Sequence, residues 1–305
     1  MTARKFLKWI ILLVIAGNLA LIAVIFLGGS KPALVVPLPN PNGYADFVKA
    51  GGLVDIRAND YTNLSHEQLS AQLAINAPAL SALRAGLTHQ TRVPVEYTTN
   101  YVDQLMPKIG QFKQLAIALA AEGRLAELEN RNNDAAHTYL EIIQFGHECA
   151  RGGLLLDHLV GIADQNIGLA AFEHIRTNLD AAECRETVHK LTALEESRES
   201  AAEIMKLESD WSRQISSLNQ RIAGMIMARS SDPLKPMRQR FETKYNGTRR
   251  QALVLTINLA ARAYTLEKGS PPKTINDLVP DYLKAIPKDP TTGANMTLGE
   301  VYSPR

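Results

Sequence analysis

Five side chains that could carry acid–base or metal chemistry gather around a glycine pair at positions 152–153. In chain order they are His147, Glu148, Asp157, His158 and Asp164. If the segments on either side of the glycines fold against one another, an imidazole and a carboxylate would meet and could act as acid and base or as metal ligands. The pattern therefore allows an exported hydrolase or metal-dependent enzyme that uses His147, Asp157 and His158.

The alternative interpretation is structural: Asp157 braces the turn while His158 faces water, since buried polar groups usually find structural partners. The sequence contains no His-Glu-x-x-His, Cys-x-x-Cys or Gly-x-Ser-x-Gly pattern and no glycine-rich phosphate loop. We favour the structural interpretation and assign no catalytic, cofactor-binding or metal-ligating residue. The charged run at 195–199 likewise has the pattern of a solvated helix face.

The composition favours a mainly helical protein. Hydrophobic residues make up 46% of the 305, but aromatic residues only 6%, and few alternating β-branched runs occur. Lysine and arginine number 33 against 31 acids, and the two signs are interspersed, so nucleic-acid binding is not expected.

The N-terminal residues predict a membrane anchor. Residues 9–27 contain one polar side chain, Asn18, and as a helix they would measure about 28 Å, close to the hydrocarbon thickness of a bilayer. The basic tail at 1–8 carries Arg4, Lys5 and Lys8, which the positive-inside rule keeps in the cytoplasm. We therefore expect a single-pass protein of the bacterial cytoplasmic (inner) membrane with an extracytoplasmic body.

A cleaved signal peptide is the alternative, because Gly28 and Ser30 are small residues at a suitable spacing. The apolar region of such a signal is usually about 7 to 15 residues long, so the longer run at 9–27 favours a retained anchor. Four prolines within residues 31–43 predict that segment 28–43 is an extended stalk.

The body at 44–245 is predicted to be a series of helices. Helices at 100–129 and 135–150, separated by a polar break, should form an antiparallel pair that resembles a single tetratricopeptide unit. The residues that carry this resemblance are Gly123, Ala126, Ala135, Tyr139, Ile142 and Ile143. The pattern does not recur at 34 residues, so we expect no repeat array.

Two glycines seven positions apart, Gly161 and Gly168, each cost a helix ~1 kcal/mol relative to alanine. They indicate that a partner helix comes close at that stripe. Cys149 and Cys184 also lie in predicted helices, where two buried thiols are favoured over a disulfide.

One long helix is predicted over 181–228, because apolar residues recur at spacings of three, four and seven. They include Leu194, Ala201, Ile204, Trp211, Ile215, Leu218, Ile222 and Met225. Such a stripe packs along another helix or pairs with a second chain. We therefore expect helix 181–228 to bind a protein partner or to mediate self-association.

About 45 residues within the C-terminal segment 246–305 resemble the head region of type II secretion pseudopilins. The resemblance rests on a helix ending at Tyr264 and Gly269, then Asp277-Leu-Val-Pro-Asp-Tyr-Leu283, Ile286-Pro287, Asp289-Pro290 and Gly293. It implies a small antiparallel sheet after the helix, hence an α+β segment, and an accessory role in a type II secretion or pilus-like system. The N-terminal span departs from that family because it lacks the pilin cleavage signature.

The prolines after Gly269 independently prevent further helix. Five apolar residues should then cover the helix, namely Leu278, Val279, Tyr282, Leu283 and Ile286. The whole order of segments also resembles a group of uncharacterised bacterial membrane-anchored proteins. Our leading hypothesis is a membrane-anchored extracytoplasmic scaffold, with the exported enzyme and the secretion accessory as alternatives.

Overall fold

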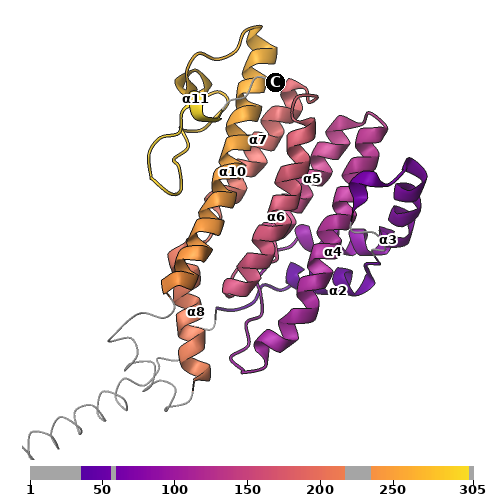
Figure 1. Cartoon of the computed structure of the whole chain (residues 1–305), viewed down its shortest axis with the longest axis vertical. Coiled ribbons are helices and arrows are strands. Elements are labelled where there is room, and N and C mark those ends of the chain that lie inside the picture. The colour runs from indigo at the N-terminus through magenta and orange to yellow at the C-terminus, as the bar shows by residue number, and fades with distance from the viewer. Residues whose placement is uncertain (1–35, 56–59, 217–234, 302–305) are drawn as a thin grey trace, which may run out of the picture.

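The computed structural model describes residues 36–55, 60–216 and 235–301, which form a mainly helical body (Figure 1). The mainly helical prediction is confirmed. The predicted anchor at 9–27, the tail at 1–8 and most of the stalk lie outside the described residues. Within the described ranges, no helix combines the length and apolarity needed to cross a bilayer.

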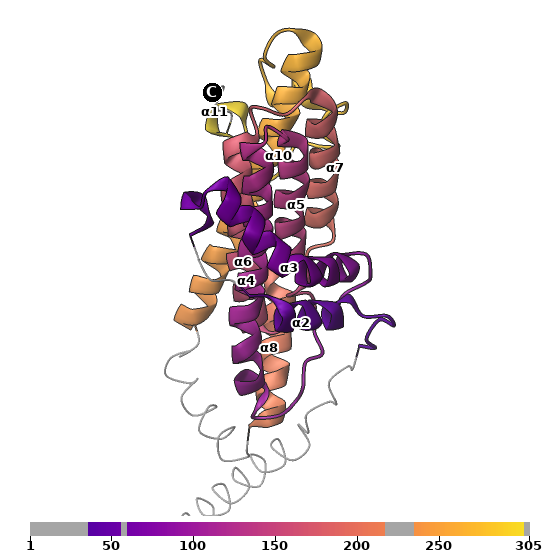
Figure 2. The same ribbon diagram turned by 90° about the vertical axis from the view of Figure 1, so that its right-hand side faces the viewer.

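The larger helices run roughly side by side along the body. They are α4 (Tyr101–Leu128), α5 (Asn132–Glu148), α6 (Leu155–Ile175), α7 (Ala181–Glu196) and α10 (Lys235–Lys268). The short helix α2 (Gly43–Leu53) and the helix α3 (His66–Leu87) cover α4 on one side (Figure 2). A short turn of helix, η1 (Tyr61–Asn63), precedes α3, which begins at a capping box formed by Ser65 and Gln68.

One continuous hydrophobic core contains residues from each of the helices α2 through α7 and from α10. Phe145 of α5 lies at its centre and meets Phe47 and Phe112 edge-on, with ring centroids 5.1 and 5.6 Å apart. These edge-to-face contacts tie α2, α4 and α5 together. Cys149 and Cys184 are both buried and both free, as the sequence favoured.

The predicted helical pair is confirmed as α4 and α5. A Cβ atom on Gly123 would lie 2.2 Å from the ring of Tyr139, so the small residue of α4 makes room for the large one of α5. The Tyr139 hydroxyl donates a hydrogen bond to Glu127. Gly123 and Tyr139 therefore interlock across the two helices.

The α5 and α6 backbones approach closely at Gly146 and Gly161. A Cβ atom on Gly161 would lie 2.2 Å from the carbonyl oxygen of Gly146, and one on Gly168 would lie 2.8 Å from that of Tyr139. The expectation of a close partner helix along this stripe is confirmed, and the partner is α5.

The prediction of one long helix over 181–228 is wrong for residues 181–216, the part of this range that the structure describes. The chain forms α7, leaves the helix at Ser197 and restarts at α8 (Ala201–Ile215). The cause is a capping box: the Ser200 hydroxyl accepts the Glu203 N–H at 3.2 Å, and the Glu203 carboxylate accepts the Ser200 N–H at 2.8 Å. Residues 217–228 lie outside the described residues.

The apolar stripe of α8 packs within the chain. Ile204 joins a cluster with Phe241 and Tyr245 of α10. Trp211 packs against Tyr101, with ring centroids 6.1 Å apart, and donates its indole N–H to the Glu96 carbonyl at 2.8 Å. These contacts account for the spacing that suggested a long pairing helix.

After α10 the chain turns at Gly269, whose φ of +73° is the left-handed conformation expected of a helix C-cap glycine. Leu278, Tyr282 and Leu283 are buried in the main core, and Val279 and Ile286 pack partly against it, which confirms the predicted cover of the helix. This cover includes the short helix η2 (Ile275–Leu278), and the described chain ends in α11 (Leu298–Val301).

The small antiparallel sheet implied by the pseudopilin resemblance is not seen in the described part of this segment. One isolated bridge joins Lys288 to Asn295. The Asp289 carboxylate accepts the N–H groups of Thr291 and Thr292, and this tight turn leaves few residues to pair as strands. The predicted boundary at 245/246 falls inside α10, which runs unbroken from Lys235.

We predict that Gly161→Ala lowers the free energy of unfolding by about 2–4 kcal/mol, because the new Cβ meets the backbone of α5 and overpacks the contact. Gly247→Ala is the matched control, since a Cβ there meets nothing within 4 Å and the change should stabilise α10 by about 0.5–1 kcal/mol. Denaturant unfolding of both variants measures the difference. Equal effects at the two positions would refute the close contact.

Candidate functional site

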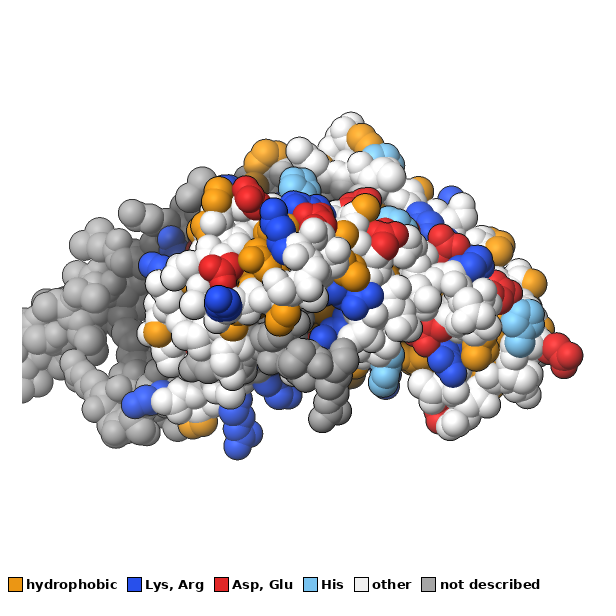
Figure 3. Space-filling view, turned by 90° about the horizontal axis from the view of Figure 1, so that it is seen from above, with side chains coloured by type: hydrophobic (Ala, Val, Ile, Leu, Met, Phe, Trp, Pro, Cys, Tyr) orange, Lys and Arg blue, Asp and Glu red, His pale blue; other side chains and the backbone are white. Residues whose placement is uncertain are grey.

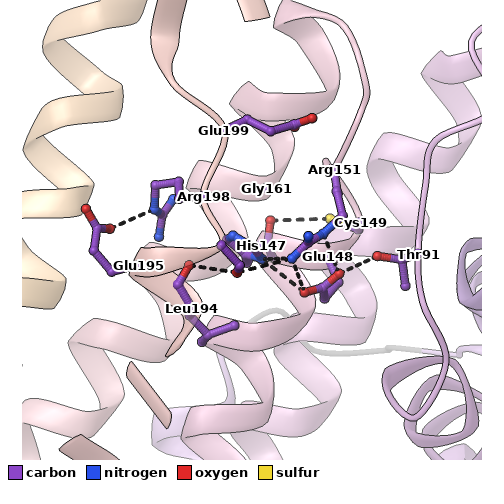
Figure 4. Close-up of polar contacts among 12 residues, drawn as sticks. Thr91, His147, Glu148, Cys149, Arg151, Gly161, Leu194, Glu195, Arg198 and Glu199 are labelled. Carbon is purple, nitrogen blue, oxygen red and sulfur yellow. Dashed lines mark hydrogen bonds and ion pairs between the residues drawn. The ribbon is translucent and has the colours of Figure 1, made fainter. Parts of the chain in front are cut away.

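The turn between α5 and α6 is fixed by a carboxylate with several donors. Glu148 accepts hydrogen bonds from the Arg151 guanidinium at 2.8 and 2.9 Å and from the Thr91 hydroxyl, and lies 3.1 Å from the His147 ring (Figure 4). Burial alone would raise the pKa of Glu148, but the bonds from His147 and Thr91 outweigh it and lower the pKa to about 2. Glu148 is therefore ionised throughout the physiological range.

His147 and His158 line one small cavity of about 10 Å³, roughly the space of one water molecule. Both rings are buried. His158 lies edge-on to Phe241 and Tyr245, and its Nε2 is 3.5 Å from a Glu199 oxygen, too long for a good hydrogen bond. The expectation that His158 faces water is wrong, because α10 covers it.

Burial lowers the pKa of His147, since a charged ring would lose its hydration there. Arg198 and Arg151 lower it further, while Glu148 opposes them. A neutral His147 is the form that this environment favours.

Arg198 closes the cavity and is almost wholly buried. It donates to Glu195 at 3.0 Å (Figure 4). It also donates to Gln165 of α6 at 2.8 Å, and Glu195 accepts a second bond from Arg249 of α10. Glu195 and Arg198 thus join an interhelical network, whereas Glu196 and Ser197 are exposed, so the expected solvated face holds for only part of the run 195–199. Sequence reasoning missed this network because the charge pattern alone does not show that α10 lies over these residues.

Asp157 has a bracing role, as the structural interpretation predicted. Its carboxylate accepts the Leu154 N–H at 2.8 Å and the Tyr101 hydroxyl at 3.1 Å. Burial raises its pKa, and these two hydrogen bonds oppose the rise. Asp157 thereby stabilises the first turn of α6 and is not among the residues that line the cavity of His147 and His158.

Asp164 has no hydrogen-bond partner for either carboxylate oxygen and is completely buried. Burial raises its pKa to about 8, and the charge of Lys113 offsets this only in part. Asp164 is therefore protonated at neutral pH, and its carboxyl group has an environment separate from that of the other four residues.

The five predicted residues thus divide among three environments. The structure brings His147 and His158 to one cavity, keeps Glu148 ionised at its edge, and places Asp157 and Asp164 elsewhere. The cavity has room for a water molecule but not for an organic substrate, so the arrangement acts chiefly to hold α5, α6, α7 and α10 together.

A larger polar groove crosses α3, α4 and α5 and encloses about 260 Å³. Arg84 of α3 lies at its centre and bridges Glu122 of α4 at 2.7 Å and Glu141 of α5 at 2.8 Å. The remaining lining residues are Ala126, Arg131, Asp134, His137 and Thr138. No sequence pattern predicted this groove, because its residues come from three helices and have no common spacing.

One further group matches metal-binding geometry within the described ranges: His137, Glu183 and Glu186, whose ligand atoms all lie within 4.8 Å of one another. The residues singled out in the sequence are not part of it.

Comparison of the chain with protein-family models, with curated proteins and with solved structures found no significant match.

We predict that Asp164 makes the protein less stable as the pH rises. Its pKa is raised from 3.8 to about 8 in the folded state, so between these values the folded chain keeps a proton that the unfolded chain releases. The free energy of unfolding therefore has its full value, as far as Asp164 is concerned, below about pH 4. It falls between pH 4 and pH 8 by ~1.4 kcal/mol for each pH unit.

Asp164→Asn should flatten this pH dependence and raise the stability at pH 8 by a few kcal/mol. Asp281→Asn, at an exposed carboxylate, is the control and should leave the profile unchanged. Urea unfolding between pH 4 and pH 8 checks the prediction. The prediction would be contradicted if the free energy of unfolding of the wild type rose with pH and that of Asp164→Asn rose in the same way. Asp164 would then be ionised in the native protein.

Proposed function

We propose that the chain is a membrane-anchored extracytoplasmic scaffold that docks a protein partner in the groove across α3, α4 and α5. Residues 9–27 would hold it in the bacterial inner membrane, and the proline-rich segment 28–43 would carry the body away from the bilayer. The single observation that carries the docking role is this groove of about 260 Å³, built on rigid helices and lined by charged side chains.

The groove favours a basic partner segment. Its walls contribute the carboxylates of Glu122, Asp134 and Glu141 against the guanidiniums of Arg84 and Arg131, which leaves one net negative charge. Arg84 is already matched by Glu122 and Glu141, and Arg131 donates to Asp134 and Glu129. An incoming lysine or arginine side chain would meet acceptors that retain free lone pairs.

The described surface that Figure 3 shows has no competing field of one sign. On the face shown in Figure 3, acidic and basic side chains are interspersed with apolar ones. A partner would then be selected by local fit and by the acidic excess of the groove, because scattered charges of both signs give little long-range attraction.

The test places a cysteine at the rim of the groove in the full chain, in its native membrane. Asn133→Cys is exposed, and the native cysteines are buried, so a membrane-impermeant bifunctional maleimide should react at position 133 from outside the cytoplasm. We expect one discrete crosslinked partner. Adding Glu141→Gln should reduce its yield about tenfold, because it removes the acidic excess.

Glu173→Gln is the control, since it neutralises an exposed glutamate on α6 away from the groove and should leave the yield unchanged. Ala3→Cys controls for topology and should react only after the cells are lysed. Labelling of position 3 but not of position 133 in intact cells would overturn the orientation. Equal crosslinking with and without Glu141→Gln would overturn the groove as the docking site.

A further inference from the structure

A histidine and two glutamates from different helices converge beside the docking groove. His137 projects from α5, while Glu183 and Glu186 lie three residues apart on α7, and one ligand atom from each falls within 4.8 Å of the other two. His137 and Glu183 are the nearest pair, with Nε2 and Oε2 3.4 Å apart. Two ligands of one tetrahedral ion at ~2.1 Å from the metal would lie about 3.4 Å apart.

The carboxylate of Glu183 lacks a strong partner of its own. The residue is only 6% exposed, yet its contacts to the Thr187 hydroxyl and the His137 ring are both 3.4 Å, longer than a normal hydrogen bond. Burial raises the pKa of Glu183; the neighbouring His137 opposes this rise, and the charge of Glu186 adds to it. A cation between the two carboxylates would relieve both effects.

We propose that His137, Glu183 and Glu186 bind a divalent first-row transition-metal ion, with water completing its coordination. One imidazole and two carboxylates form a mixed nitrogen and oxygen donor set, which suits Zn²⁺, Co²⁺ or Mn²⁺ better than a purely oxygen-seeking ion such as Mg²⁺. The site joins α5 to α7 and shares His137 with the docking groove, but neither Glu183 nor Glu186 lines that groove.

The three positions can adopt the bound geometry with little movement. Glu183 is fixed by the first turn of α7, where its N–H donates to Asp180 at 2.8 Å. Glu186 is exposed and pairs with Lys190 at 2.6 Å. Because that ion pair is on the surface and weak, Glu186 can exchange Lys190 for the metal by a side-chain rotation.

The experiment titrates the detergent-solubilised full chain with Co²⁺, whose visible absorption reports coordination by protein ligands, and then displaces it with Zn²⁺. We expect one saturable site per chain. His137→Ala should abolish the cobalt spectrum, and Glu186→Gln should weaken binding about tenfold or more, because each removes one of only three protein ligands.

His189→Ala is the matched control. His189 is an exposed histidine on α7, the helix that carries Glu183 and Glu186, and it is not one of the three proposed ligands. The variant should bind Co²⁺ like the wild type. Circular dichroism of each variant confirms that the fold is retained, since His137 and Glu186 are both exposed. The proposal is overturned if the wild-type chain shows no saturable Co²⁺ binding, or if folded His137→Ala binds as the wild type does.

Discussion

Gly146 of α5 and Gly161 of α6 bring two helix backbones so close that any side chain on Gly161 would strike the carbonyl oxygen of Gly146. Much of the body depends on this contact. It sets the distance between the two central helices, and the turn that joins them then carries Glu148, Arg151 and Asp157 into fixed hydrogen-bonding positions. Two glycines thus trade helix propensity for an interhelical contact that larger residues would prevent.

The buried polar groups around the turn follow from that approach. Glu148 is satisfied by Thr91, His147 and Arg151, and Arg198 joins Gln165 to Glu195, so these charges stabilise helix positions without being exposed. Asp164 and Nε2 of His158 are exceptions, because neither has a hydrogen-bond partner, and burial keeps Asp164 protonated. The sites open to solvent lie on the other side of α5, in the charged groove and at His137.

The sequence predicted well what depends on local spacing. Gly161 and Gly168 indicated a close partner helix, and Gly269 marked the end of α10. The predicted long helix 181–228 failed because the apolar spacing was given more weight than the capping box at Ser200 and Glu203, whose signal was present in the sequence. Periodicity reports which residues are buried, but it does not say whether one helix or two bury them.

The candidate sites were harder to predict because they depend on contacts between distant elements. His137 and Glu183 are 46 positions apart, and only the packing of α5 on α7 brings them together. His158 is buried because α10, about 80 residues later, lies over it. Neither the His137–Glu183 contact nor the cover of His158 by α10 follows from residue spacing along the chain. A search for sequence motifs could therefore not have found these two sites.

Native-state hydrogen exchange tests most directly whether the α5–α6 contact organises the body. The account predicts that amides in the second half of α5 and the first half of α6 exchange slowest, and that Gly161→Ala accelerates both helices together, including the turn at Glu148. It would be contradicted if the two helices exchanged at unrelated rates, or if Gly161→Ala left the protection of α5 unchanged.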